Sequence, residues 1–184
     1  WPNSYSMEQY IIENKLVSPK KLEVIGHGSS NGVSLSRYSI PALSEEKIEE
    51  TKKRMNYDPS LKYFLSVGRI VHDKGMDELL NAFVRLYATN PHTRLVLVGA
   101  FEDEVDPVSD KARQLIQTHP AVIMAGWSDA VEYFMHLSFA LVHPSHREGF
   151  PNVLLQAGAM SCPIISSRID GNIDIVEHAT TGLL

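Results

Sequence analysis

The sequence predicts an α/β protein built on a Rossmann-like parallel sheet with helices on both faces. Five short apolar segments, at 63–67, 95–98, 122–124, 139–142 and 163–165, show no alternation of polar and apolar residues. Segments with the apolar spacing of helices separate them. Strands without alternation are buried on both faces, which is typical of parallel sheets covered by helices.

Seven helices are expected around these strands, at about 4–14, 45–55, 73–87, 107–117, 128–136, from Pro151 onward, and 173–177. Ser44, Asp73 and Ser128 are the expected caps. Pro151 is expected at the first helical position, because its fixed φ suits a helix start and its missing N–H is not needed there. The helix at 45–55 is charged and should make few core contacts. Residues 21–25 are short and β-rich, and a Gly- and Ser-rich loop follows at 26–32.

Length, charge and cysteine content limit the possible functions. The chain has 184 residues, 43% of them hydrophobic and 21% charged, which suits one globular domain with a short extra segment. A net charge of −5 implies no basic face, so nucleic acid is not an expected partner. The single cysteine, Cys162, rules out an internal disulfide and fits a reducing, cytoplasmic compartment. No apolar run reaches the length of a membrane span.

The ends of the chain suggest a piece of a longer cytoplasmic protein. The first residue is Trp1 rather than Met, and the last residues show no stop pattern. We expect residues 1–20 to be the end of a preceding domain or a linker. Residues 21–184 would then form the main domain, truncated at its C-terminus.

Four features far apart in the sequence fall at the carboxyl ends of expected strands: Arg69, Gly99, Gly126 and the loop 143–152. Ligands of open parallel sheets bind in the crevice at these ends. In the last feature, Glu148 precedes a helix start and Gln156 lies one turn into the helix. The first N–H groups of a helix have no internal partner and carry positive charge, so an anion or a hydroxyl-rich ligand fits there.

The run Arg-Glu-Gly-Phe-Pro-Asn-Val-Leu-Leu-Gln-Ala at 147–157 resembles the acidic signature of family 4 retaining glycosyltransferases, in which seven residues separate two glutamates. Glu148 matches the first glutamate, whereas Gln156 replaces the second. Gly68-Arg69-Ile70 followed by Asp73-Lys74-Gly75 also resembles the arginine and lysine-glycine pair of that family. The resemblance spans about 22–184. It implies the C-terminal, donor-binding half of a GT-B enzyme that transfers a sugar from a nucleotide diphosphate with retained configuration and without a metal.

The resemblance assigns catalytic roles to Arg69, Lys74 and Glu148. Two cations after a strand suit a diphosphate, although solvated surface cations are the alternative. Glu148 would contact hydroxyls of the donor sugar; otherwise it only stabilises a helix dipole. Trp127 would wall the nucleobase pocket, unless it is a core aromatic. The donor site would comprise Arg69, Lys74, Gly126, Trp127, Glu148, Gly149, Phe150, Pro151, Asn152, Val153 and Gln156.

Gln156 is the main departure from the family. The family's second glutamate accepts hydrogen bonds from the ribose, and glutamine has one acceptor oxygen and no charge. Because hydrogen bonds to charged groups contribute about 1.5–3 kcal/mol and neutral ones about 1 kcal/mol, a modest loss of affinity is expected. The alternative is a chain that has lost activity and serves as a non-catalytic nucleotide-sugar-binding or regulatory module.

Other features receive simpler interpretations. His143 and His146 have metal-like spacing but no third ligand nearby, so no metal site is expected. Asn172 and Glu177 should shape the chain after the fifth strand, and Cys162 should be buried. No cofactor is expected, and the donor is expected to be a UDP sugar by family habit. The acceptor, a glycan or lipid-linked sugar, would be bound mainly by the missing first half, which would also provide any peripheral membrane association.

Two other enzyme classes share this architecture. The constellation of Arg69, Lys74 and Glu148 disfavours an epimerase. A phosphorylase needs a cofactor-lysine segment, and no such segment is found.

Overall fold

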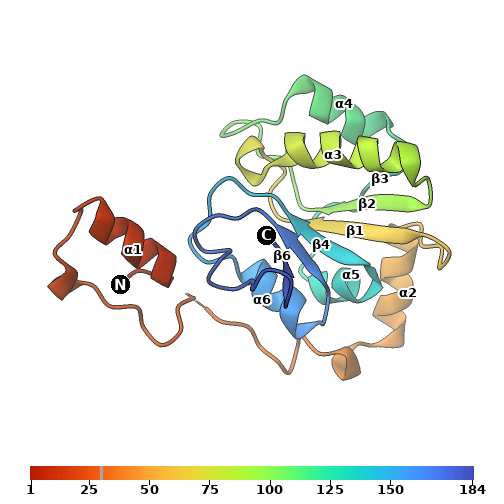
Figure 1. Cartoon of the computed structure of the whole chain (residues 1–184). Coiled ribbons are helices and arrows are strands. Elements are labelled where there is room, and N and C mark those ends of the chain that lie inside the picture. The colour runs from red at the N-terminus through yellow and green to blue at the C-terminus, as the bar shows by residue number, and fades with distance from the viewer. Residues whose placement is uncertain (30) are drawn as a thin grey trace.

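A computed structural model describes residues 1–29 and 31–184. Its centre is a parallel sheet of six strands in the order β3-β2-β1-β4-β5-β6 (Figure 1). This arrangement confirms the predicted α/β fold class. The strands are β1 (Lys62–Val67), β2 (Thr93–Val98), β3 (Val122–Met124), β4 (Ala140–His143), β5 (Ile164–Ser166) and β6 (Gly182–Leu183).

Helices cover both faces of the sheet (Figure 1). One face carries α3 (Met76–Thr89) and α4 (Asp110–Thr118), and the other carries α2 (Glu45–Arg54), α5 (Val131–Leu137) and α6 (Asn152–Ala159). Strand β2 shows why its sequence does not alternate. Leu95 and Leu97 enter the core beneath α3, whereas Val96 and Val98 enter the opposite core. All four side chains are buried, so both faces need apolar residues.

Four helix starts differ from the predictions. Residue Asp73 lies in a short 3₁₀ helix, η3 (His72–Lys74), and Gly75 is the N-cap of α3. Ser128 does not cap α5; its Oγ accepts the N–H of Ala130, which is the N-cap. Pro151 is the N-cap of α6, one residue before the predicted position. Helix α4 begins only after Ser109, whose Oγ accepts the Ala112 N–H. At Ser109 and Ser128 the serine Oγ accepts a nearby backbone N–H, a contact that apolar spacing does not reveal.

Two further predictions, for residues 173–177 and 21–25, are wrong. The chain at 173–177 forms turns rather than a helix and leads into β6, a strand too short to be recognised in the sequence. Residues 21–25 form no strand, and a 3₁₀ helix, η1 (Pro19–Lys21), overlaps their start. Helix α2 is exposed along most of its length, as predicted: Thr51 is its buried residue, and its C-cap Met55 is fully buried. Ser30, expected in the loop 26–32, lies outside the described residues.

The N-terminal segment lies beside the sheet, next to the loops that leave β4 and β5 (Figure 1). It contains α1 (Tyr5–Glu13), and a second 3₁₀ helix, η2 (Ile40–Ala42), precedes α2. The Asp174 carboxylate accepts the N–H groups of Tyr5 at 3.0 Å and Ser6 at 3.1 Å. The Gly171 N–H donates to Ser6 Oγ at 2.8 Å. These bonds tie α1 to the loop after β5.

Candidate functional site

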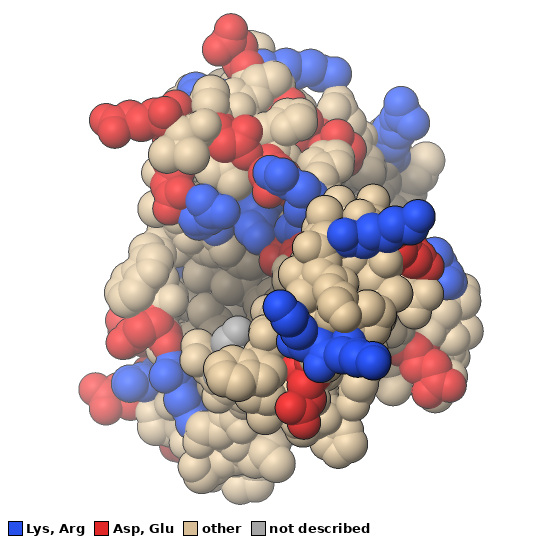
Figure 2. Space-filling model, turned by 90° about the vertical axis from the view of Figure 1, so that its left-hand side faces the viewer, with Lys and Arg blue, Asp and Glu red and all other residues tan. Residues whose placement is uncertain are grey.

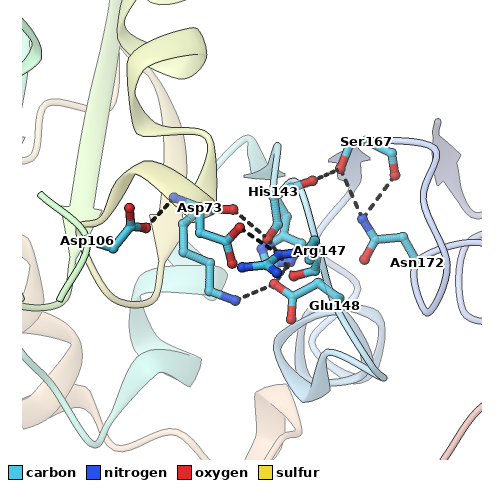
Figure 3. Close-up of polar contacts among 9 residues, drawn as sticks. Asp73, Asp106, His143, Arg147, Glu148, Ser167 and Asn172 are labelled. Atoms are coloured by element: carbon cyan, nitrogen blue, oxygen red, sulfur yellow. Dashed lines mark hydrogen bonds and ion pairs between the residues drawn. The ribbon is translucent and has the colours of Figure 1, made fainter. Parts of the chain in front are cut away.

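Glu148 lies in the loop after β4 and contacts two basic side chains. Its Oε1 atom is 2.5 Å from Lys74 Nζ and 2.9 Å from His143 Nε2 (Figure 3). The Lys74 contact is a hydrogen bond, whereas the His143 N–H is too poorly aligned for one. All three side chains are largely buried, with exposed fractions of 19% for Lys74, 12% for Glu148 and 8% for His143. Both contacts use Oε1, which leaves Oε2 available to a ligand.

The environment of Glu148 keeps its carboxylate ionised. Burial opposes the charge and on its own would raise the pKa. The contacts with His143 and Lys74 act in the other direction and outweigh burial, so the pKa falls from its usual 4.5 to about 2. The site therefore presents a permanent hydrogen-bond acceptor beside a cation at neutral pH.

Lys74 reaches Glu148 because η3 packs against the loop after β4. The N–H of His146 donates to the Asp73 carbonyl at 2.9 Å, and Ser145 Oγ donates to the same oxygen at 3.2 Å. Next to Lys74, Gly75 has φ +68, and a Cβ there would lie 2.1 Å from the Pro144 carbonyl oxygen. Only glycine fits so close an approach in a left-handed conformation.

Arg69 follows β1 at the edge of a separate hollow of about 300 Å³. Its guanidinium does not reach Glu148; instead NH1 lies 2.8 Å from Glu102 Oε2. Both side chains are nearly half exposed, at 49% and 42%, so the pair is weak and readily exchanged for another anion. The two predicted diphosphate cations therefore differ in environment: Lys74 is largely buried beside Glu148, and Arg69 is half-exposed at the separate hollow.

Trp127 lines the same hollow as Arg69 and is 71% exposed, so it is not a core aromatic. It follows Gly126, which lies two residues after the end of β3. Arg54 of α2 holds this turn in place by donating to the carbonyls of Ala125 at 2.6 Å and Trp127 at 3.0 Å. Sequence reasoning missed Arg54, because a terminal arginine on a charged helix has no distinguishing pattern.

The start of α6 lies next to Glu148. Asn152 and Val153 begin the helix, so their N–H groups have no earlier helical carbonyl to bind. The N-terminal segment contacts the start of α6, where Ser29 Oγ lies 3.0 Å from Asn152 Oδ1. A Cβ on Gly149 would lie 3.0 Å from the amide of Asn3, so the close approach that Gly149 permits is made by Asn3. Phe150 is half-buried and packs near Gly28.

Gln156 lies one turn into α6 and is half-buried, as the spacing predicts. Its neighbour is Tyr38, whose phenol is buried. Burial raises the pKa of that phenol, and the Arg37 cation and, to a smaller extent, the Gln156 side chain oppose the rise. Arg37 Nε lies 3.0 Å from the buried Glu132 and packs against the Tyr38 ring. Gln156 thus belongs to a polar corner that the sequence did not indicate.

His143 and His146 contact different carboxylates. His143 faces Glu148, whereas His146 stacks on His72 with ring centroids 5.5 Å apart and lies 3.4 Å from Glu78. Across residues 1–29 and 31–184, no three His, Cys, Asp or Glu side chains gather as a metal site would require.

Three other residues singled out in the sequence are Asn172, Glu177 and Cys162. Asn172 is fully buried, and its Nδ2 donates to the Ser167 carbonyl at 2.9 Å, while Ser167 Oγ donates to the Ser145 carbonyl at 2.5 Å (Figure 3). Asn172 therefore ties the loop after β5 to the loop after β4. Glu177 lies outside the site, where its N–H donates to Thr181 Oγ1 in the turn before β6. Cys162 is buried, and burial raises the pKa of its thiol to about 11.

The face that carries the site is hollowed near its centre (Figure 2). Lys and Arg side chains stand on the rim of this hollow, with Asp and Glu side chains among them (Figure 2). The mixture of signs agrees with the net charge of −5 and differs from the continuous basic face of a nucleic-acid-binding surface. In the described part of the chain, no helix has the length and apolar character needed to cross a bilayer.

Comparison with known proteins identifies relatives over the whole chain. The chain is 32% identical over 181 residues to the capsular polysaccharide biosynthesis glycosyltransferase CapM of Staphylococcus aureus, covering 98% of this chain and 46% of CapM. It therefore spans less than half the length of that relative.

Solved structures show the same fold. A glycosyltransferase from Rickettsia africae superposes with a TM-score of 0.84 at 18% identity, covering 98% of this chain and 47% of its own. Anabaena HepE in complex with UDP-glucose gives a TM-score of 0.81 at 20% identity, covering 99% and 48%. Both superpositions show that the sheet and its helices have the GT-B glycosyltransferase architecture. The family model of glycosyl transferases group 1 matches residues 47–184, and the chain belongs to that family.

Proposed function

We propose that this chain is the donor-binding half of a retaining, metal-independent glycosyltransferase of the family 4 type that uses a UDP sugar. One observation carries the proposal: Glu148 is held ionised at the carboxyl ends of β1 and β4, between Lys74 and His143. The capsular polysaccharide enzyme CapM and the UDP-glucose complex of HepE support this choice of activity and donor.

In this proposal the donor spans two places. The nucleobase enters the hollow lined by Trp127 and Arg69, and the diphosphate extends from there toward Lys74. Arg69 leaves Glu102 to pair with the diphosphate through its planar fork, and Lys74 adds a point charge. The N–H groups at the start of α6 supply further positive potential.

In the transfer step, negative charge grows on the departing diphosphate. Lys74 and Arg69 stabilise that charge electrostatically, which is the role a metal plays in other enzymes. Glu148 Oε2 accepts hydrogen bonds from hydroxyls of the donor sugar and so fixes the anomeric carbon for attack. Glu148 acts in this proposal as a binding group, because its Oε1 already engages two basic side chains.

The reaction needs a second half that binds the acceptor, a glycan or a lipid-linked sugar. We therefore expect the chain alone to bind UDP without turning over. The buried thiol of Cys162 agrees with catalysis in a reducing, cytoplasmic compartment, with any peripheral membrane contact made by the other half.

Calorimetric titration of the chain with UDP, GDP and ADP tests the proposal. UDP should bind saturably, and Arg69→Ala should weaken it at least tenfold. Arg85→Ala, an exposed arginine on α3, is the matched control and should leave binding unchanged. Absence of nucleotide binding by the folded chain, or equal loss in both variants, would contradict a donor site at Arg69.

A second candidate function is a non-catalytic nucleotide-sugar-binding or regulatory module. Gln156 favours it, because the ribose contact lacks a carboxylate. If this chain has lost a working ribose contact, Gln156→Glu in the full-length protein should raise donor affinity and transfer together. Measurable sugar transfer by the full-length protein with Gln156 in place would exclude the non-catalytic candidate.

A further inference from the structure

A hollow of about 520 Å³ borders Glu148 on the side of α1 and shares no residue with the hollow of Arg69 and Trp127. Met7 and Tyr10 of α1 form one wall. The loop after β4 contributes His146, Arg147 and Glu148, and the loop after β5 contributes Ile169 and Asp170. Its volume falls within the range of about 300–1,000 Å³ that is usual for small-molecule sites.

The walls of this hollow combine two kinds of chemistry. Met7, Tyr10 and Ile169 offer apolar contact, and the Tyr10 side chain is 49% exposed. Arg147 and Asp170 are exposed and offer opposite hydrogen-bonding groups, since guanidinium only donates and an ionised carboxylate only accepts. A sugar ring has an apolar face and a rim of hydroxyls that both donate and accept. It therefore matches this pairing better than a purely anionic or purely apolar ligand does.

A contact with Asp73 orients the Arg147 side chain. Its Nε lies 3.1 Å from Asp73 Oδ1 (Figure 3). This single contact uses the inner nitrogen and leaves the two terminal amino groups of the guanidinium for a ligand. Asp73 also precedes Lys74, so the same 3₁₀ turn positions the lysine beside Glu148 and the arginine at the edge of the hollow.

The α1 wall is fixed to the rest of the site. The Asp174 carboxylate binds the N–H groups at the start of α1, and Ser6 binds the Gly171 N–H, one residue after Asp170. Met7 and Tyr10 follow directly on these anchored residues. The spacing between the apolar wall and the polar wall is therefore set by bonds within this chain.

We propose that this hollow is a subsite for the acceptor, and that it binds a sugar ring through Tyr10, Arg147 and Asp170. The inference rests on the proposed glycosyltransferase function. It changes one expectation from the sequence, because this half would then contribute acceptor contacts of its own. Glu148 lines this hollow and not the hollow of Arg69 and Trp127, so a ring here would lie beside the carboxylate proposed to hold the donor sugar without occupying the nucleotide site.

Saturation-transfer NMR on the chain tests the subsite. The probes are methyl α-D-glucopyranoside, methyl α-D-galactopyranoside and methyl 2-acetamido-2-deoxy-α-D-glucopyranoside. At least one should bind with a millimolar dissociation constant and stay bound when the chain is saturated with UDP or with the corresponding UDP sugar. Asp170→Asn and Arg147→Ala should each weaken it at least fivefold, whereas Arg168→Ala, an exposed neighbour that does not line the hollow, should not.

The outcomes separate this inference from the donor proposal. If UDP binds and none of the glycosides does, the subsite is wrong and the donor site stands. If a UDP sugar displaces the glycoside but UDP alone does not, the hollow belongs to the donor sugar and the inference is again wrong. If neither UDP nor any glycoside binds the folded chain, both proposals fail. Calorimetric UDP affinity should be equal in wild type, Asp170→Asn and Arg147→Ala.

Discussion

Lys74 Nζ and Glu148 Oε1 lie 2.5 Å apart, although the two residues are 74 positions apart in the sequence. The two residues follow β1 and β4, which are neighbours in the sheet, so the strand order brings their loops together. The pair is largely buried, and His143 completes it from the end of β4. The folded state therefore stabilises an ionised carboxylate that is fully solvated in the unfolded chain.

The first prediction follows from this charge. The folded pKa of Glu148, about 2, is below its usual 4.5, so its stabilisation is fully present above pH 4.5 and is lost as the pH falls toward 2. The full shift corresponds to about 3 kcal/mol as an upper bound. Urea unfolding at pH 6 and pH 3 should show a smaller loss of stability in Glu148→Gln than in wild type, by about 2 kcal/mol.

Glu50→Gln is the matched control for the pH experiment, because Glu50 is an exposed carboxylate on α2. This variant should lose as much stability between pH 6 and pH 3 as wild type does. Equal losses in wild type and Glu148→Gln would show that the Glu148 carboxylate is not held by its basic neighbours.

The second prediction concerns the ribose contact. Gln156→Glu places a charged acceptor where the family has its second glutamate, so UDP affinity should rise by about 1 kcal/mol, or about fivefold. Titration with 2′,3′-dideoxyuridine diphosphate provides the control, because it lacks both ribose hydroxyls. A gain of equal size with both nucleotides would place Gln156 away from the ribose.

The third prediction concerns Arg69 and its partner Glu102. Glu102→Gln frees the guanidinium and removes a negative charge beside the incoming diphosphate, so UDP should bind about threefold more tightly in dilute buffer. The gain should shrink at high salt, where screening is strong. Glu104→Gln changes an exposed carboxylate in the same loop and should have no such effect. Weaker binding by Glu102→Gln would mean that Glu102 itself contacts the ligand.

The sheet could be predicted because strands buried on both faces are apolar without alternation, and this pattern is visible in the sequence. The five apolar segments expected as strands became β1–β5, whereas β6 has only two residues and shows no such pattern. The convergence expected at the carboxyl ends is seen in two places: Arg69 and Gly99 line one hollow and the Gly99 N–H donates to the Gly126 carbonyl, while Glu148 of the 143–152 loop meets Lys74. Parallel strands alone require this convergence, whatever the side chains are.

The remaining features depend on contacts between distant segments. Nothing in the sequence near Asp73 shows that its carbonyl binds the His146 N–H, so the prediction of a helix cap there was wrong. The same holds for Arg54 at the Trp127 turn and for Tyr38 beside Gln156. Single polar residues have many possible partners, and only the packed structure selects one.

The fourth prediction compares two glycines that flank the site. Gly75→Ala places a methyl group 2.1 Å from the Pro144 carbonyl oxygen at φ +68, so it should destabilise the chain by about 2 kcal/mol or more and shift the neighbouring Lys74. Gly158→Ala, on the exposed side of α6 with nothing within 4 Å of the added carbon, should stabilise by about 0.5–1 kcal/mol. Urea unfolding measures both changes. UDP affinity should fall only in Gly75→Ala, because only that substitution separates η3 from the loop that carries Glu148; unchanged affinity there would mean that Lys74 is not needed for binding.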